Sequence, residues 1–481
     1  MPTQAYLLFD ERMALHRPIP DPEDPDYYPF ENPDRIFKVY GRLLDLERRL
    51  ARDVSDDVLQ NELVPRFVEF PCKPVERETV ELVHSREHYD WLFHTAFMSD
   101  GRLRQLTDPD DLYICQSTFL ASSLACGGVV ECVNKVTSED TTLDNNSSER
   151  KITRAIALVR PPGHHAEENE AMGFCFFNNI AVAAKHAIST GRAKRVFILD
   201  WDIHHGNGIQ NLTYDDPNIF YLSIHRTSFM ADGGPNKKYK EEWFYPGTGR
   251  PTEVGEGSGT GANLNLVWTR SGMGNEEYAT AFGELVLPVL SSFQPDLILV
   301  ACGLDAAKGD LLGDCGLSPD MYYIMTKSLL DQAGADIPLV AVLEGGYNIN
   351  VSAECMENVA LAILDEPCHN GKYYDLSRYW KTTGTLSSSA GGNDSDASHG
   401  SLSARKQRRK KRQSKASKRK TETATNCIRE SALALEEAER ANADKLYPIV
   451  PGTPSYHCVH GTGPMKKRKQ EDDLPFEYLV I

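Results

Sequence analysis

Short apolar runs alternate with longer amphipathic stretches along most of the chain, from Ala5 to about Asp375. Runs of about five apolar residues suit strands that are buried on both faces, and amphipathic stretches suit the helices that cover them. This alternation predicts an α/β protein with a mostly parallel sheet. We place the end of the folded domain near residue 380, because the sequence beyond it becomes rich in Ser, Gly and Asn, a composition that stays flexible.

Two segments break this pattern. Residues 137–150 are almost entirely polar, so we expect them to form a flexible surface insertion within the domain. Residues 381–481 are expected to form a largely disordered tail. The sequence therefore predicts one large domain over residues 1–380 with an appended tail.

Four of the apolar runs share a further feature, since a polar cluster follows each of them at once. They are Ala155–Val159 before Gly163-His164-His165, Val196–Leu199 before Asp200-Trp201-Asp202-Ile203-His204-His205, Leu297–Ala301 before Gly303-Leu304-Asp305, and Leu339–Leu343 before Glu344-Gly345-Gly346-Tyr347. Ligands of open parallel sheets bind outside the carboxyl ends of the strands. We therefore expect these polar side chains to converge at one edge of the sheet.

A metal site is predicted within these clusters. Asp202 and His204 alternate just past a strand, so their side chains point the same way. Asp305, at the end of another strand, is the natural third ligand. Two carboxylates and one imidazole, with a position left for water or substrate, suit a catalytic Zn²⁺. An isolated Asp-x-His would more often be a helix cap or a buried polar group, but the matching clusters at the other strand ends favour the metal.

Composition excludes several classes of protein. The 481 residues are 41% hydrophobic and 9% aromatic, which is enough for a sizeable core. No apolar run reaches the ~18–20 residues of a membrane span, and the N-terminus lacks the order of a signal peptide. The 11 cysteines form no CxxC pairs, so we expect reduced thiols in a cytosolic or nuclear protein with no membrane partner.

Five ordered motifs carry a resemblance to a known family. They are Arg160-Pro161-Pro162-Gly163-His164-His165-Ala166, Gly173-Phe174-Cys175-Phe176-Phe177-Asn178, Asp200-Trp201-Asp202-Ile203-His204-His205-Gly206-Asn207-Gly208, Gly303-Leu304-Asp305-Ala306-Ala307 and Glu344-Gly345-Gly346-Tyr347-Asn348. Together they resemble the zinc-dependent histone deacetylases, class II in particular, over about residues 5–370. The resemblance implies a three-layer arginase/deacetylase-like fold and the hydrolysis of Nε-acetyl-lysine on histones or other proteins, with release of acetate.

The resemblance also implies a role for each residue of the clusters. These roles are Asp202, His204 and Asp305 as zinc ligands, His164 as general base, His165 as general acid, Asp200 and Asn207 as the partners of His164 and His165, and Tyr347 as the donor to the oxyanion. A Tyr at position 347, where the weakly active branch of class II has His, implies an active enzyme. Asn207 stands where class I has Asp, and a neutral amide stabilises an imidazolium less than a carboxylate, so His165 should be the less basic histidine.

The substrate tunnel is predicted by the same resemblance. Gly173 and Phe174 match one wall, and Tyr245 matches the other at a position where Phe is usual; either aromatic could instead be ordinary core. Leu312 stands where the polyamine-selective relative carries an acidic gatekeeper, and Leu cannot attract a polycation. Asp111 is similar to the mouth residue that holds the substrate backbone, with a surface acid as the alternative.

Two further sites are implied. Arg35 resembles the arginine that lines a product channel behind the zinc, although a structural arginine is the alternative. Asp200 and the carbonyl groups near Ser223 and Ile224 resemble a structural potassium site of the family, which side chains alone do not establish.

The tail differs in charge from the rest of the chain. Residues 401–481 carry 18 Lys and Arg against 10 Asp and Glu, a net charge of +8, whereas the whole chain carries −17. Eleven of the basic residues fall within 405–420, and 466–469 form a second cluster. Such runs indicate nuclear import or nonspecific nucleic-acid contact, or a solvated tail without function. We expect a nuclear protein that could also shuttle with the cytoplasm, and a short Ala/Glu-rich helix for a partner within 424–445.

Other functions remain open from the sequence. One is deacetylation of acetyl-polyamines or other small amides on the same scaffold. Another is a weakly catalytic module that binds acetyl-lysine within a corepressor or chromatin complex, against which Tyr347 argues. An arginase-like ureohydrolase would need a second metal and a further carboxylate in a D-x-H-x-D run, and here Gly206 stands at that position.

Overall fold

The computed structural model describes residues 3–20, 28–52, 64–108, 111–138, 151–227, 229–230, 241–368 and 404–441. Within them, one eight-stranded sheet runs through the centre of the molecule in the order β2-β1-β3-β10-β9-β4-β5-β8, and all its neighbouring strands are parallel. The strands are β1 (Ala5–Phe9), β2 (Phe67–Glu69), β3 (Arg154–Leu158), β4 (Val196–Asp200), β5 (Ile219–Arg226), β8 (Asn263–Trp268), β9 (Leu297–Cys302) and β10 (Leu339–Leu343). A small antiparallel pair, β6 (Phe229–Met230) and β7 (Glu241–Glu242), lies outside this sheet. The predicted α/β fold is confirmed.

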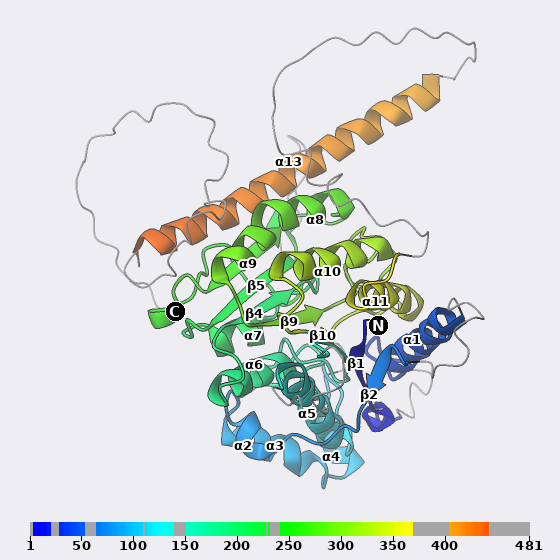
Figure 1. Ribbon diagram of the computed structural model, residues 1–481, viewed down its shortest axis with the longest axis vertical. Helices are drawn as coiled ribbons and strands as arrows, with labels where there is room; N and C mark the ends of the chain where they lie inside the picture. Colours follow the sequence, from blue (N-terminus) through cyan, green and yellow to red (C-terminus); the bar gives the residue numbers. More distant parts are fainter. Residues whose placement is uncertain are drawn as a thin grey trace, which may run out of the picture.

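Helices cover both faces of the sheet and complete three layers (Figure 1). α5 and α6 pack together on one face, and α1, α10 and α11 pack together on the other. The helices are α1 (Asp34–Arg52), α2 (Arg77–Val80), α3 (Arg86–Thr95), α4 (Asp100–Leu106), α5 (Thr118–Thr137), α6 (Asn179–Ser189), α7 (Asn207–Thr213), α8 (Asn275–Ala281), α9 (Leu287–Phe293), α10 (Pro319–Ala333), α11 (Ile349–Ile363) and α13 (Ala404–Ala441), with 3₁₀ turns η1 (Glu11–Leu15) and η3 (Gly257–Gly259) and a π-helical turn η4 (Phe282–Val286) between α8 and α9.

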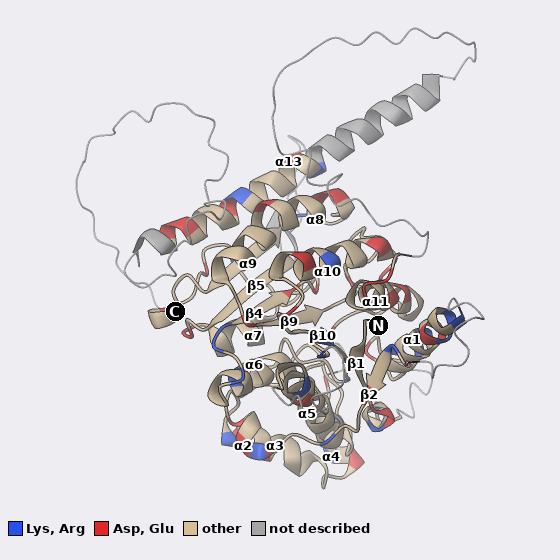
Figure 2. Ribbon diagram, viewed as in Figure 1, with Lys and Arg blue, Asp and Glu red and all other residues tan. Residues whose placement is uncertain are grey.

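The four strands that precede the polar clusters are direct neighbours in the centre of the sheet, in the order β3-β10-β9-β4. Every residue of these four strands is buried, because helices lie on both faces. Charged side chains lie mainly on the outer helices (Figure 2). Since the strands are parallel, their carboxyl ends share one edge, and the clusters that follow them lie together there.

α5 is the one described helix that is long and apolar enough to cross a membrane. Most of its residues are buried inside the domain, where it packs on α6 and on the strands β3 and β10. Its apolar character therefore suits a core helix of the three-layer domain. α5 ends at Thr137, and residues 139–150 of the predicted insertion lie outside the described residues.

The C-terminal segment contains one long helix, α13, where we expected a short helix for a partner within an otherwise disordered tail. The second half of α13 packs against the edge strand β8 and against α8. The Ser431 hydroxyl donates to the carbonyl of Asn265 in β8 at 2.7 Å, so the helix satisfies a backbone acceptor of the exposed sheet edge. The side chains that face the domain recur every three or four residues: Ala424, Cys427, Ile428, Ser431, Ala432, Leu435 and Ala438.

This periodic stripe explains the difference from the prediction. The average composition of the tail is polar, but an amphipathic helix needs only one apolar face in order to pack on a domain. The Ala/Glu-rich helix that we expected to bind a partner thus packs against the chain's own domain. Residues 369–403 and 442–481, which include the basic cluster 466–469, lie outside the described residues, as do the side chains of 404–419.

Two leucines of α13 provide a test of this packing. Leu435 is 2% exposed, whereas Leu433 is 37% exposed on the same helix. Leu435→Ala should lower the free energy of unfolding by about 2–4 kcal/mol, because it removes buried methyl groups and leaves a cavity. Leu433→Ala should change it by less than about 0.5 kcal/mol. Urea denaturation of the two variants measures both values, and equal values would mean that α13 does not pack here.

Candidate active site

The candidate active site lies at the carboxyl edge of the four central strands. Asp202 and His204 follow β4, Asp305 follows β9, and Tyr347 follows β10. The histidine pair, His164 and His165, lies on the loop that leads from β3 to α6. Strand order thus brings together six residues that are up to 183 positions apart in the sequence.

A three-residue cluster at this edge could hold a metal ion. Ligand atoms of Asp202, His204 and Asp305 all lie within 4.8 Å of one another, and the three residues are buried. The Nδ1 atom of His204 lies 3.1 Å from Oδ1 of Asp202 and 3.0 Å from Oδ2 of Asp305. Two oxygen donors and one nitrogen donor around a common point fit a zinc ion with an open coordination position.

The electrostatics of the cluster also fit a cation. Burial, together with the negative charge of the nearby Asp202, raises the pKa of Asp305 to about 7, because both disfavour the charged form of its carboxyl group. Gly303 and Gly345 allow this crowding, since a Cβ atom at either position would clash with the Asp202 carboxylate. Backbone N–H groups of Ile203 and Gly345 donate to the two carboxylates at 2.9 and 2.8 Å and hold them in place.

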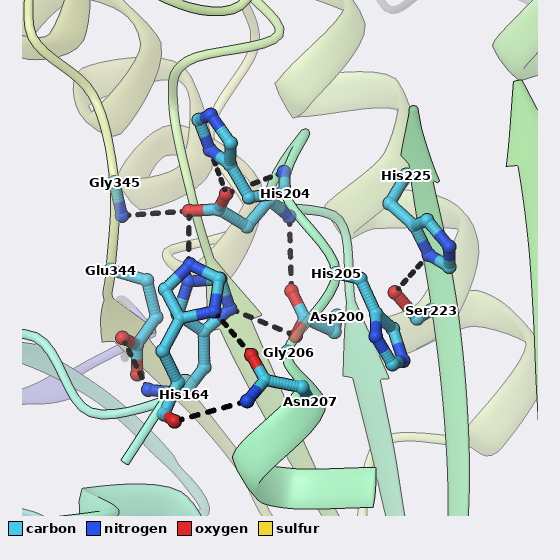
Figure 3. A network of polar contacts seen from close by, with 12 residues as sticks. His164, Asp200, His204, His205, Gly206, Asn207, Ser223, His225, Glu344 and Gly345 are labelled. Carbon is cyan, nitrogen blue, oxygen red and sulfur yellow. Dashed lines mark hydrogen bonds and ion pairs between the residues drawn. The ribbon is translucent and has the colours of Figure 1, made fainter. Parts of the chain in front are cut away.

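The two histidines of the pair have different partners. Figure 3 shows His164 with Asp200 and Asn207 close by. The Nδ1 atom of His164 lies 3.1 Å from a carboxylate oxygen of Asp200, whereas Nδ1 of His165 lies 2.8 Å from the amide oxygen of Asn207. Burial alone would lower the pKa of His164, but Asp202 and Asp200 raise it to about 10. Burial, together with the neighbouring His164 and His204, lowers the pKa of His165 well below its usual value.

Sequence reasoning missed a carboxylate that supports the histidine loop. Glu344 ends the apolar run of β10, and its Oε2 atom accepts the backbone N–H groups of Gly163 and His164 at 2.7 and 3.1 Å. Burial raises the pKa of Glu344 to about 7. The signal was present in the Glu-Gly-Gly-Tyr motif, but only the fold shows that Glu344 faces the loop of the neighbouring strand β3.

Tyr347 is 8% exposed, and its ring lies beside the guanidinium of Arg35. Burial raises its pKa well above 10, and Asp202 and Asp305 lie close enough to add to this effect. The guanidinium of Arg35 lies 5.1 Å from the centre of the Tyr347 ring and donates to the carbonyls of Gly346 and Glu344. Arg35 is itself buried and paired with Glu31 at 3.1 Å, so it fixes the backbone that carries Tyr347.

The predicted mouth residues lie around the same site. One carboxylate oxygen of Asp111 accepts the backbone N–H of Gly173 at 2.7 Å and the hydroxyl of Tyr245 at 2.9 Å. The Tyr245 ring meets the His165 ring edge-on, with centroids 5.1 Å apart. Phe174 meets Tyr347 in the same manner at 5.8 Å. The extra hydroxyl of Tyr245, relative to Phe, therefore binds the mouth loop.

Phe174 has an unusual backbone. Its φ is +66°, a left-handed conformation that is rare for an aromatic residue and that clusters at functional sites. Its N–H donates to the carbonyl of Asp111 at 3.0 Å, which helps to hold this conformation. No pattern in the sequence indicated this strain.

Two further predicted sites are the gatekeeper position Leu312 and the potassium site near Ser223. Leu312 is half-buried, and its N–H donates to the carboxylate of Asp310, whose other oxygen accepts the N–H groups of Tyr347 and Asn348. Asp310 thus ties the Leu312 loop to Tyr347, a link that sequence reasoning missed. Ser223 pairs with Asp200 in the register of β4 and β5, as the implied potassium site would require.

Comparison with known proteins gives a consistent result. A family model described as "Histone deacetylase domain" matches residues 30–363. The chain is similar to histone deacetylase HDA1 of Candida albicans, with 36% identity over 385 residues that cover 77% of this chain and 42% of the relative. It is also similar to histone deacetylase clr3 of Schizosaccharomyces pombe, with 37% identity over 367 residues that cover 75% and 48%.

A solved structure agrees with these relatives. The crystal structure of the HDA15 HD domain superimposes with a TM-score of 0.61 at 31% identity, covering 79% of this chain and 94% of that one. The chain spans about half the length of the curated relatives that it matches.

Proposed function

Because the chain belongs to the histone deacetylase family, we propose that it hydrolyses the Nε-acetyl amide of lysine side chains in histones or other proteins and releases acetate. The observation that carries this proposal is the buried cluster of Asp202, His204 and Asp305 beside a histidine pair and a tyrosine. These three residues would hold a Zn²⁺ ion. When bound, the ion supplies a Lewis acid for the amide carbonyl and makes a water molecule more acidic.

The histidine pair moves the protons of the reaction. The hydrogen-bond partners of the two rings favour His165 as the general base, whereas the sequence analysis assigned this role to His164. The Asp200 carboxylate stabilises a charged His164, whereas the Asn207 amide leaves His165 neutral. His165 is therefore the better acceptor for the proton of the attacking water, and it can then pass this proton to the leaving lysine amine. His164 holds positive charge near the developing negative charge.

Tyr347 donates its hydroxyl to the oxyanion of the substrate. Its buried phenol keeps its proton, since its pKa is raised well above 10. Such a donor stabilises charge that develops only in the transition state. Phe174 and Tyr245 form apolar walls for the methylene chain of the lysine, and the Asp111 carboxylate beside them would accept N–H groups of the substrate backbone.

Acetyl-polyamines are the second candidate substrates. An acidic side chain at position 312 would attract their positive charges, and the chain has Leu312 there. This difference favours acetyl-lysine.

Two variants separate metal binding from turnover. Asp202→Ala should lose both zinc and activity, because it removes a ligand. Tyr347→Phe should retain zinc but lower kcat by about 10²–10³, because it removes one donor to the oxyanion. Zinc content per chain and the rate on an acetyl-lysine peptide are measured for each variant. Near-normal turnover of Tyr347→Phe would remove the phenol from the mechanism.

The substrate class is tested with three substrates at equal concentration: an acetylated histone peptide, a small N-alkyl acetamide and an acetyl-polyamine. We expect the histone peptide to give the highest kcat/KM. Asp111→Ala should raise KM for the peptide about 10-fold or more and raise KM for the small amide by a smaller factor, because only the peptide offers backbone N–H groups while both substrates use the walls that Asp111 holds. Preference for the acetyl-polyamine, or no hydrolysis of any substrate, would contradict the proposed function.

We also propose that the protein acts in the nucleus, in a chromatin complex. The basic clusters at 405–420 and 466–469 and the histone deacetylase names of the relatives support this location. Replacing the four basic residues of 466–469 and those of 405–412 with Ser should shift a fluorescent fusion towards the cytoplasm. Leu433→Ala, which should leave the stability of the domain nearly unchanged, serves as the control. An unchanged nuclear signal would remove the clusters from import.

A further inference from the structure

A carboxylate outside the predicted site contacts the partner of His165. Glu167 lies two residues after His165, on the loop between β3 and α6, and is half-buried. One of its oxygens accepts the side-chain N–H of Asn207 at 2.5 Å. Asn207 in turn offers its amide oxygen to Nδ1 of His165 at 2.8 Å. The three side chains form a continuous chain of hydrogen bonds that ends at the candidate base.

The contacts of Asn207 define which way its amide points. Its nitrogen has three acceptors around it: the Glu167 carboxylate, the His165 carbonyl at 3.3 Å and the sulfur of Met172 at 3.3 Å. A reversed amide would place its oxygen against a carboxylate and a carbonyl, which repel it. The oxygen of Asn207 therefore faces His165, and Nδ1 of His165 must carry the hydrogen.

Glu167 is held independently of the histidine. The side-chain nitrogen of Asn211 lies 2.9 and 3.1 Å from its two oxygens. Asn207 and Asn211 are one turn apart on α7, so one face of this short helix presents both amides to the same carboxylate. Burial raises the pKa of Glu167, while the two asparagines act in the opposite direction.

We propose that Glu167 is a positioning residue for His165, an inference that rests on the proposed function. Its carboxylate orients the Asn207 amide, and this amide holds the neutral His165 ring in the tautomer whose Nε2 atom is free to accept a proton. His164 thus contacts the Asp200 carboxylate directly, whereas the Glu167 carboxylate acts on His165 only through the Asn207 amide.

Exchanging the amide and the carboxylate between positions 207 and 167 tests this arrangement. Asn207→Asp alone would set a second carboxylate against Glu167, across a contact that is now 2.5 Å. Two carboxylates at that distance cannot both be ionised, so one must take up a proton. Adding Glu167→Gln replaces the repulsion with an amide donor and gives His165 a direct carboxylate partner.

The experiment uses the zinc-loaded full chain and two readouts. The first is the ¹⁵N NMR signal of the His165 ring, which reports the tautomer without turnover. The second is kcat/KM for an acetyl-lysine peptide as a function of pH. We expect Glu167→Ala to lower kcat/KM by about 10–100-fold and to give a mixture of tautomers, as the loss of an orienting partner does. Glu168→Ala, at the exposed neighbouring position, is the control and should change neither readout.

The Asn207→Asp variants provide a second test of the role of Glu167. Asn207→Asp alone should lower kcat/KM by at least about 10-fold, and the double variant Asn207→Asp, Glu167→Gln should recover most of it. In the double variant the carboxylate partner raises the pKa of His165, so the acidic limb of the pH profile should move to higher pH. The other titratable groups that face His165 are His164, His204, Asp202, His205, Cys175 and Tyr245, and Glu170 faces Glu167; all are unchanged in these variants.

The outcomes separate this inference from the proposed function. A wild-type protein that hydrolyses no acetyl-lysine contradicts the proposed function, while the NMR signal still reports whether Glu167 sets the tautomer. Wild-type activity with an unchanged tautomer and unchanged kcat/KM in Glu167→Ala would overturn the role of Glu167. A double variant no better than Asn207→Asp alone would also overturn it, because the repulsion would then not be the cause of the loss.

Discussion

The concentration of buried negative charge at one edge of the sheet is the constraint on which the site depends. Asp200, Asp202, Asp305 and Glu344 are all fully buried within the space of a few side chains. Burying unpaired carboxylates costs several kcal/mol each unless donors or cations compensate them. Backbone N–H groups at the strand ends supply part of this compensation, and histidines supply another part. The remainder fits a divalent cation among the three ligand atoms.

The order of the strands explains why these charges meet. Neighbouring parallel strands end at the same edge, and the four strands that carry the clusters are the four central ones. The carboxylates at this edge are buried, which strengthens each electrostatic interaction there. Glycine at 303 and 345 then permits the loops to approach the Asp202 carboxylate without a clash. Fold and charge are therefore coupled, because a sheet with another strand order would separate the ligands.

The sequence could predict residues whose positions depend on the ends of strands, but it could not predict contacts that depend on how the loops pack. Asp202, His204 and Asp305 follow buried apolar runs, and a parallel sheet brings such positions together whatever the loops do. Asp310 and Glu167 lie in loops, and their contacts depend on where those loops turn in space. The docking of α13 was missed for a related reason, since the average composition of the tail conceals a stripe with a period of three to four residues.

The contrast between the two histidines shows how a second layer of side chains can separate chemically identical groups. Both rings are fully buried and lie 4.0 Å apart, so burial lowers the basicity of each to a similar extent. What differs is the distance to the nearest supporting carboxylate, which His164 contacts directly and His165 reaches only through an amide. Since two adjacent imidazolium ions would repel each other, placing the direct carboxylate on one ring assigns the positive charge to that ring. The other ring is left neutral, with a nitrogen available for a proton, which is the condition that a general base must meet.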